Sequence, residues 1–182
     1  MKILGVLNEF YDDFEFIKEK WNEKYEGILI KIKEEQGYKR CRLAKKTPKK
    51  EGYFTAFWKK DSRNKNIPYT NEDLGNELVI VVIDNDKRGL FIIPNDEAIR
   101  KKILSTKDSK GKMAMRFYPP WSTDLNKTAL EAQKWQLKFF RIIVNVNLNM
   151  SKKFKIKMYI LFICLLEKIF KSIRISSYFS YM

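Results

Sequence analysis

The chain of 182 residues contains no histidine and two cysteines, Cys41 and Cys164. The cysteines are far apart, and neither belongs to a CxxC pair or another zinc-ligand spacing. Without histidine, acid–base catalysis by imidazole is excluded, as are Ser-His and Cys-His nucleophile pairs. A catalytic site in this sequence would therefore have to rely on carboxylates and lysines.

Long apolar segments are missing as well. The short apolar run at the N-terminus is followed at once by Glu9, Asp12 and Asp13, so the sequence does not predict a secretory signal. The apolar run at residues 158–166 has nine residues, whereas a spanning helix needs about 20. We therefore expect a cytoplasmic protein without a membrane-spanning segment.

Positive charge is abundant and unevenly placed. The chain has 37 Lys and Arg against 22 Asp and Glu, which gives a net charge of +15. Residues 39–65 hold eleven basic and two acidic residues, and the remainder of residues 1–143 holds equal numbers of both signs. Such concentration is typical of a surface that meets a polyanion. The alternative is a solvated lysine-rich hairpin that serves solubility.

Hydrophobic periodicity predicts a domain of helices and strands. Residues 7–21 place Leu7, Phe10, Phe14, Ile17 and Trp21 at helical spacing. Strands are predicted at 26–35, 38–44, 53–58, 78–83, 90–93 and 112–118, with a polar loop at 61–76. A helix starts near 95, and another runs from a cap at Ser122, Thr123 or Asp124 to 143. The order predicts an α/β or α+β domain with a mixed β-sheet flanked by helices.

Several motifs occur together in one order. They are Ala44-Lys45-Lys46-Thr47-Pro48-Lys49-Lys50-x-Gly52-x-Phe54, Trp58-Lys59, Arg116-x-Tyr118-Pro119-Pro120-Trp121 and Gln133-x-Trp135-Gln136. Over residues 25–140 this order resembles the MepB-like family. The family usually has a Gly-Lys-Arg-Gly run where this chain has Gly111-Lys112-Met113-Ala114, so one basic contact is missing. The resemblance implies a restriction-endonuclease-like core, an unassigned activity and a gene beside a multidrug efflux pump.

Restriction-endonuclease-like folds include metal-dependent nucleases, which hold divalent cations with carboxylates near a lysine. The strands expected to carry such residues are basic and have one carboxylate, Glu51, in the turn between them. Asp108-x-Lys110 lies in a Gly/Ser/Lys loop, and Asp84 and Asp86 fit a hairpin turn. We therefore expect no catalytic activity, no metal and no cofactor, and keep the nuclease as the alternative.

The favoured interpretation is a non-catalytic nucleic-acid-binding protein with a basic β-hairpin surface. Cations displace counterions from phosphates, and aromatic rings stack on bases. On a regular strand Arg40 and Arg42 would share a face about 7 Å apart. The aromatic candidates could equally pack in the core, and Gln133 could bond a strand end. The candidate contacts are Arg40, Arg42, Lys45, Lys46, Thr47, Lys49, Lys50, Trp58, Lys59, Lys60, Lys112, Arg116, Tyr118, Trp121 and Gln133.

The predicted ligand is DNA or RNA, bound with little sequence specificity. A protein-interaction adaptor linked to drug-efflux regulation is a further alternative.

The predicted globular domain ends at residue 143, where the composition changes. Residues 144–182 contain no Gly, Pro, Ala, Asp, Thr or Gln and carry seven basic residues and one acidic residue. We hypothesise that this tail is out-of-frame sequence from an AT-rich reading frame. A basic amphipathic helix on a membrane surface is the alternative.

Overall fold

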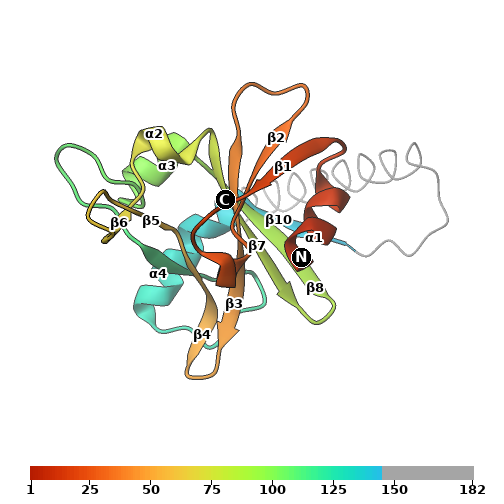
Figure 1. The fold of residues 1–182 in the computed structure, drawn as a ribbon. Coiled ribbons are helices and arrows are strands. Elements are labelled where there is room, and N and C mark those ends of the chain that lie inside the picture. The colour runs from red at the N-terminus through yellow and green to blue at the C-terminus, as the bar shows by residue number, and fades with distance from the viewer. Residues whose placement is uncertain (145–182) are drawn as a thin grey trace, which may run out of the picture. The chain divides into compact units, whose positions relative to one another are not determined.

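The computed structural model describes residues 1–144, and both interpretations of the tail concern residues that lie almost entirely outside this range. An eight-stranded mixed sheet forms the centre of the described part (Figure 1). Its main path is β1-β2-β3-β7-β8-β10, while β4 pairs with the end of β3 and β9 pairs with β4. The strands are β1 Phe14–Lys18, β2 Ile28–Ile32, β3 Lys39–Thr47, β4 Lys50–Ala56, β7 Glu77–Asp84, β8 Lys87–Pro94, β9 Ala114–Phe117 and β10 Phe140–Ile143. The β3–β7 pair is parallel, and the other pairs are antiparallel.

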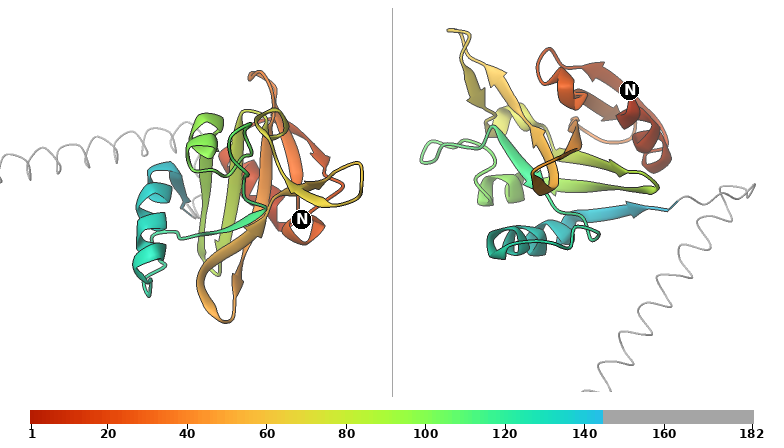
Figure 2. Two further views of the ribbon diagram at one scale, coloured as in Figure 1. Left: turned by 90° about the vertical axis from the view of Figure 1, so that its left-hand side faces the viewer. Right: turned by 90° about the horizontal axis from the view of Figure 1, so that it is seen from below.

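Helices cover both faces of this sheet (Figure 2). They are α1 Lys2–Phe10, α2 Asn71–Leu74, α3 Asn95–Arg100 and α4 Lys127–Gln136, with 3₁₀ turns η1 Glu23–Tyr25 and η2 Leu137–Phe139. The α1 helix buries Ile3, Val6 and Leu7 in the core on one face. Ala98 of α3 and Trp135 of α4 pack into the core on the other face. The predicted fold class, a mixed sheet flanked by helices, is confirmed; the endonuclease-like core stays a prediction.

The predicted central strand is confirmed as β7. It lies between β3 and β8, and Leu78, Val79, Ile80, Val81 and Val82 are fully buried. Alternate side chains enter the two cores on opposite faces of the sheet. A continuous apolar run is the expected sequence for a strand covered on both sides.

The position of the basic hairpin depends on β3, which belongs to two ladders. Its first part, from Lys39 to Ala44, pairs with β7 in the main sheet. After Ala44 the strand leaves β7, and Lys45 and Lys46 pair with β4 instead. The residues on the main sheet are buried, whereas Lys45 and Lys46 are exposed. The β3–β4 hairpin therefore projects beyond the main sheet (Figure 1).

The predicted helix over residues 7–21 is wrong. The α1 helix ends at Phe10, and residues 14–18 form β1, which pairs with β2 over its whole length. Residue spacing could not reveal this, because pairing with β2 is a non-local contact that overrides helical periodicity in a short segment. Ile17, which lay on the apolar stripe of the predicted helix, is exposed on this edge strand, as is Phe16.

The last predicted helix is also too long, and its cap is misplaced. The cap is Asn126, whose side-chain Oδ1 accepts from the Ala129 amide at 2.9 Å. The helix ends at Gln136, and Phe140 begins β10, which pairs with β8. A Cβ at Gly89 of β8 would lie 2.3 Å from the Phe140 ring. Because Gly89 has no side chain, β10 can lie against β8, and residues 140–143 form a strand instead of continuing the helix.

The predicted strand over residues 53–58 is divided in two. β4 ends at Ala56, and a separate two-stranded sheet begins at Trp58. Between them, Phe57 is buried, and its amide donates to the Met113 carbonyl. That sheet consists of β5 Trp58–Lys60 and β6 Asn66–Pro68, so the predicted polar loop contains a strand as well as α2. The break at Phe57 redirects the chain away from β9.

Candidate nucleic-acid interface

One row of side chains crosses three strands of the projecting hairpin. Phe54 of β4 lies opposite Lys45 of β3 on one side and Arg116 of β9 on the other. Directly opposed residues point to the same face of a sheet. The Arg116 guanidinium lies 5.6 Å from the centre of the Phe54 ring, within the range of a cation–π contact. This face therefore presents an aromatic ring between two cations.

The hairpin turn adds two exposed lysines, Lys49 and Lys50. Its geometry is fixed by Thr47, whose hydroxyl accepts from the Arg116 guanidinium at 2.8 Å. Gly52 has a φ of 83°, and a Cβ there would lie 2.5 Å from the Tyr118 ring. Tyr118 thus packs against the hairpin backbone, so the lysines extend from a supported turn.

Lys46 lies on the opposite face of the hairpin from Lys45. It pairs in register with Tyr53, and its Nζ lies 3.9 Å from Oδ2 of Asp84. The same Asp84 oxygen accepts from the Tyr53 hydroxyl at 2.5 Å. Burial, then this hydrogen bond, raises the pKa of Tyr53. Lys46 is still largely exposed, but its charge is partly balanced by Asp84.

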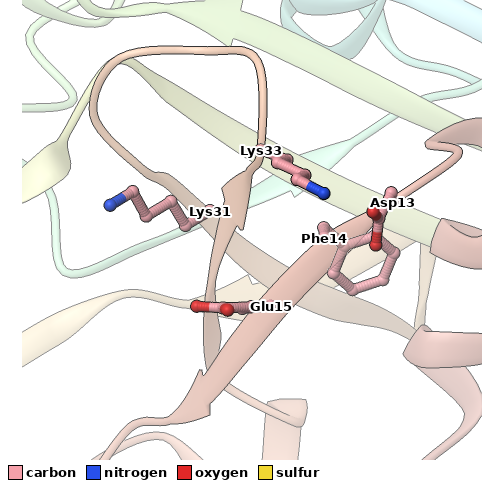
Figure 3. A pocket seen from close by; sticks show the side chains of 5 residues that line it. All are labelled: Asp13, Phe14, Glu15, Lys31 and Lys33. Carbon is pink, nitrogen blue, oxygen red and sulfur yellow. The ribbon is translucent and has the colours of Figure 1, made fainter.

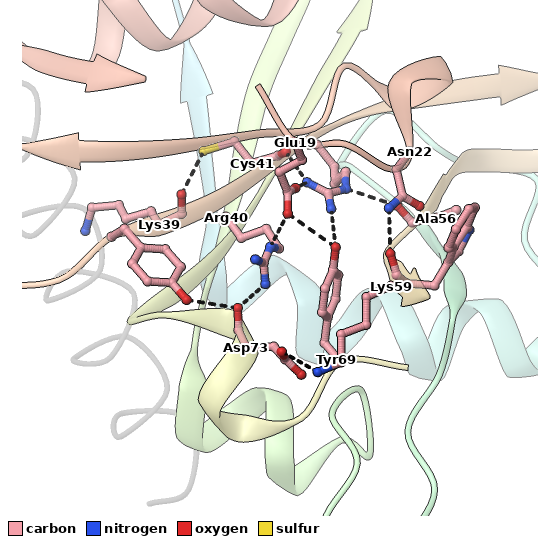
Figure 4. Close-up of polar contacts among 12 residues, drawn as sticks. Glu19, Asn22, Lys39, Arg40, Cys41, Ala56, Lys59, Tyr69 and Asp73 are labelled. Carbon is pink, nitrogen blue, oxygen red and sulfur yellow. Dashed lines mark hydrogen bonds and ion pairs between the residues drawn. The ribbon is translucent and has the colours of Figure 1, made fainter. Parts of the chain in front are cut away.

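Arg40 and Arg42 do not form the predicted pair of exposed cations. Figure 4 shows Arg40 between Glu19 and Asp73. Arg42 is fully buried and Arg40 is 7% exposed. Both bind Glu19: Arg40 Nε donates to Glu19 Oε1 at 2.8 Å, and the Arg42 guanidinium pairs with Oε2. Arg42 also donates to the Ala56 carbonyl and the Tyr69 hydroxyl. Burial on the main-sheet part of β3 makes these arginines structural, so the prediction that they contact nucleic acid is wrong.

Lys59 and Lys60 lie on β5, next to the hairpin strands in sequence. Lys59 Nζ lies 2.6 Å from Oδ1 of Asp73, so its charge is paired. Burial by itself would raise the pKa of Asp73, but hydrogen bonds from Lys59 and Thr70 outweigh this effect and lower it. Lys60 donates to the Asn64 carbonyl and keeps its charge available. Trp58 is half-buried and stacks on Trp21.

The remaining candidates divide between structural and open positions. Gln133 donates to the carbonyls of Pro119 and Ser122, at 3.1 and 3.0 Å. These bonds hold the turn before α4 and occupy the amide nitrogen of Gln133. That nitrogen is therefore engaged by the backbone and does not point to a base. Trp121 Nε1 donates to the Tyr53 hydroxyl, and its ring packs against Phe140. Lys112 is exposed and donates to the carbonyl of Lys101.

Carboxylates do not gather near the hairpin. Within residues 1–144, no group of three or more Asp, Glu or Cys side chains is placed to hold a metal ion. Asp84 is the last residue of β7 and is engaged by Tyr53 and Lys46. Asp108 lies in an exposed loop, where its amide donates to the Thr106 hydroxyl.

A separate depression lies on the β1–β2 hairpin (Figure 3). It has a volume of about 280 Å³ and is lined by Asp13, Phe14, Glu15, Lys31 and Lys33. Two carboxylates and two ammonium groups face it, so it lacks the excess of one charge that distinguishes the β3–β4 hairpin.

Two aromatic residues of the β3–β4 hairpin region, Phe54 and Tyr25, were not among the predicted nucleic-acid contacts. Phe54 is central to the three-strand row, and Tyr25 meets it edge-on, with ring centres 6.0 Å apart. Phe54 could have been found from strand alternation, because it shares the parity of Lys50. Tyr25 could not, because its position depends on how η1 folds against β3 and β4.

Comparison with known proteins places this arrangement in a family. The model of the MepB-like family matches residues 19–141, which include the hairpin, β9 and α4. The chain belongs to the MepB-like family. Its fold is similar to a solved structure described as the crystal structure of MepB, with 42% sequence identity and a TM-score of 0.69. That match covers 81% of this chain and 97% of the other. No curated protein matches the chain.

This membership agrees with the resemblance carried by the sequence motifs. The fold and the family are thereby shown. Within residues 1–144 no helix is long and apolar enough to cross a membrane.

Proposed function

We propose that this MepB-like protein binds nucleic acid in the cytoplasm, without cutting it, through the exposed face of the β3–β4 hairpin. The observation that carries the proposal is the cross-strand row of Lys45, Phe54 and Arg116. One cation lies on each side of an aromatic ring. The cations suit the phosphates of a nucleic-acid strand, and the ring suits its bases. Lys49 and Lys50 extend the positive charge to the tip of the hairpin.

The chemistry of this surface favours binding without sequence readout. Lysine and arginine contacts to phosphates position a strand but carry no sequence information. The amide of Gln133, the side chain best suited to read a base edge, is engaged by backbone carbonyls. The ligand class is therefore DNA or RNA of varied sequence.

The test is fluorescence-anisotropy binding of the full chain to labelled DNA and RNA oligonucleotides at several salt concentrations. The four hairpin contacts to phosphates, from Lys45, Lys49, Lys50 and Arg116, should contribute about −3 to −4 to the slope of log K against log salt. The triple variant K45A/K49A/K50A should reduce this slope by about 2 to 3. The variant K31A/K33A/K87A, which removes three exposed lysines elsewhere, should change it much less.

Parallel incubations with Mg²⁺ or Mn²⁺, resolved on a gel, test the nuclease alternative. Intact strands are expected, and metal-dependent cleavage would replace the binding proposal with a nuclease. Equal slopes for both triple variants would show that the hairpin is a solvated face. The adaptor alternative would then be tested with protein partners.

A further inference from the structure

A second aromatic pair lies beyond the three-strand row. Trp21 and Trp58 stack with ring centres 6.3 Å apart and planes inclined by 28°. Neither indole is fully buried. Trp58 begins β5, directly after the break at Phe57, whereas Trp21 precedes η1. Residues far apart in the sequence therefore join two indoles at one place beside the hairpin strands.

This pair repeats the pattern of the first one. Tyr25 and Phe54 also form an aromatic contact. Tyr25 follows Trp21 by four residues, and Phe54 precedes Trp58 by four residues. The segments 21–25 and 54–58 thus run antiparallel, with an aromatic contact at each end. Four residues span at most about 14 Å even when fully extended, and η1 shortens residues 21–25 further, so the two aromatic contacts lie within a few nucleotides of each other. Asn22 fixes the arrangement, because its side-chain amide donates to the Trp58 carbonyl at 2.8 Å.

Cations accompany both indoles. Lys60 Nζ lies 5.9 Å from the Trp58 ring centre and 6.0 Å from that of Trp21. Lys20 Nζ lies 4.8 Å above the Trp21 ring. Neither lysine forms an ion pair with a carboxylate in the described part of the chain, in contrast to Lys59, which binds Asp73. Lys20 is exposed, so it can leave the indole face when a flat ligand replaces it.

We infer that Trp21, Trp58, Lys20 and Lys60 form a nucleotide-contact site, in which an indole stacks on a base and the lysines bind the adjoining phosphates. The inference rests on the proposed function, because the same strand would reach the site from the hairpin. An indole face suits a base, and an ammonium group without a carboxylate partner beside it suits a phosphate. The alternative is that the indoles serve only to pack β5 against residues 19–22.

The test compares a twelve-nucleotide thymidine oligomer with an abasic oligomer of the same length and phosphate number. The full-length protein should bind the base-bearing oligomer more tightly. The single variants W21L and W58L should each weaken binding of that oligomer by roughly 5- to 160-fold and leave binding of the abasic oligomer within about twofold. The variant W58F should recover most of the loss, because a phenyl ring can still stack.

The matched control is W135L. Trp135 is also partly buried and has a lysine, Lys101, 5.0 Å above its ring, but it lies on α4. W135L should leave the preference for the base-bearing oligomer unchanged. Far-UV circular dichroism and thermal unfolding identify variants that do not fold, and for those W58F provides the comparison.

Two failures are distinguishable. If W21L, W58L and W58F bind both oligomers as the unaltered protein does, the indoles are packing residues, and the proposed function of the hairpin stands. If the unaltered protein binds neither oligomer at low salt, the proposed function fails and this site fails with it.

Discussion

The side-chain amide of Gln136 on α4 donates to the carbonyl of Arg116 on β9 at 2.9 Å and accepts from the Tyr118 amide at the same distance. Gln136 is fully buried. One glutamine therefore connects the last helix to the outermost strand of the hairpin surface. The position of the Arg116 side chain, at the edge of the basic row, depends on this link.

Replacing Gln136 with leucine tests that link. The variant Q136L leaves the Arg116 carbonyl and the Tyr118 amide without their partner, and each unsatisfied buried group costs about 1 to 3 kcal/mol. We expect a lower free energy of unfolding in urea. The control T128A, on an exposed position of α4, should change it little. An unchanged midpoint for Q136L would show that water replaces the amide.

Arg116 should contribute to binding as a phosphate contact. The variant R116A should reduce the salt slope of oligonucleotide binding by about 1. It also removes the bond to Thr47 and the contact with Phe54. R116K keeps the charge and should restore most of the slope, although not the geometry of the planar guanidinium. If R116A leaves the slope unchanged, Arg116 serves only to support the turn.

Arg42 should affect stability and not binding. The variant R42A would remove one of the two arginines that bind Glu19, whose side chain is 10% exposed, and would leave Glu19 Oε2 without its cation. Breaking a buried ion pair in this way costs about 3 to 5 kcal/mol. Denaturant unfolding measures this loss, and anisotropy at a temperature where the variant is folded should give an affinity within about twofold of the unaltered protein. A large loss of affinity without loss of stability would return Arg42 to the binding surface.

The Asp84 carboxylate should weaken binding, because it lowers the net positive charge of the hairpin next to Lys46. The variant D84N removes one negative charge but keeps an oxygen that can accept from Tyr53. We expect affinity for oligonucleotides to rise roughly two- to threefold at low salt, and the gain to fade as salt screens the charge. The change D86N, in the neighbouring turn, is the matched control. A fall in affinity for D84N would mean that Asp84 organises the hairpin.

Asp73 should make stability depend on acid pH. Its pKa in the folded protein is lower than its ordinary value of 3.8, so the folded state holds the ionised form more firmly than the unfolded state does. This stabilisation is present above about pH 4 and is lost as the pH falls through the folded pKa. Thermal unfolding between pH 2 and pH 6 should therefore show a smaller acid loss for D73N than for the unaltered protein. Equal losses would place the acid sensitivity elsewhere.

Local patterns predicted those parts of the fold that depend on local sequence. The apolar run at 78–83 indicated β7, since a continuous apolar run of strand length predicts a central strand buried on both faces. The charge concentration at 39–65 indicated the projecting hairpin. Residues 14–18 and 140–143 were assigned to helices instead, because their strands exist through pairing with β2 and β8.

The candidate site was predicted in part for the same reason. Lys45, Lys49 and Lys50 are exposed, as their place near a turn suggested. Arg40 and Arg42 are basic residues of the same segment, and nothing in the sequence separates them from these lysines. The ladder with β7, however, places both arginines next to Glu19. No spacing between residues 19 and 42 could have indicated that contact.

The sequence by itself determined the chemistry available to this protein: no histidine, an excess of lysine, and aromatic residues among the cations. It also determined membership of the MepB-like family, through motifs that keep their order. Tertiary structure decided which cations face solvent. The strand β3 passes from a sheet covered on both sides to a hairpin beyond it, so burial forces Arg40 and Arg42 into ion pairs, whereas Lys45, Lys49 and Lys50 are exposed to solvent.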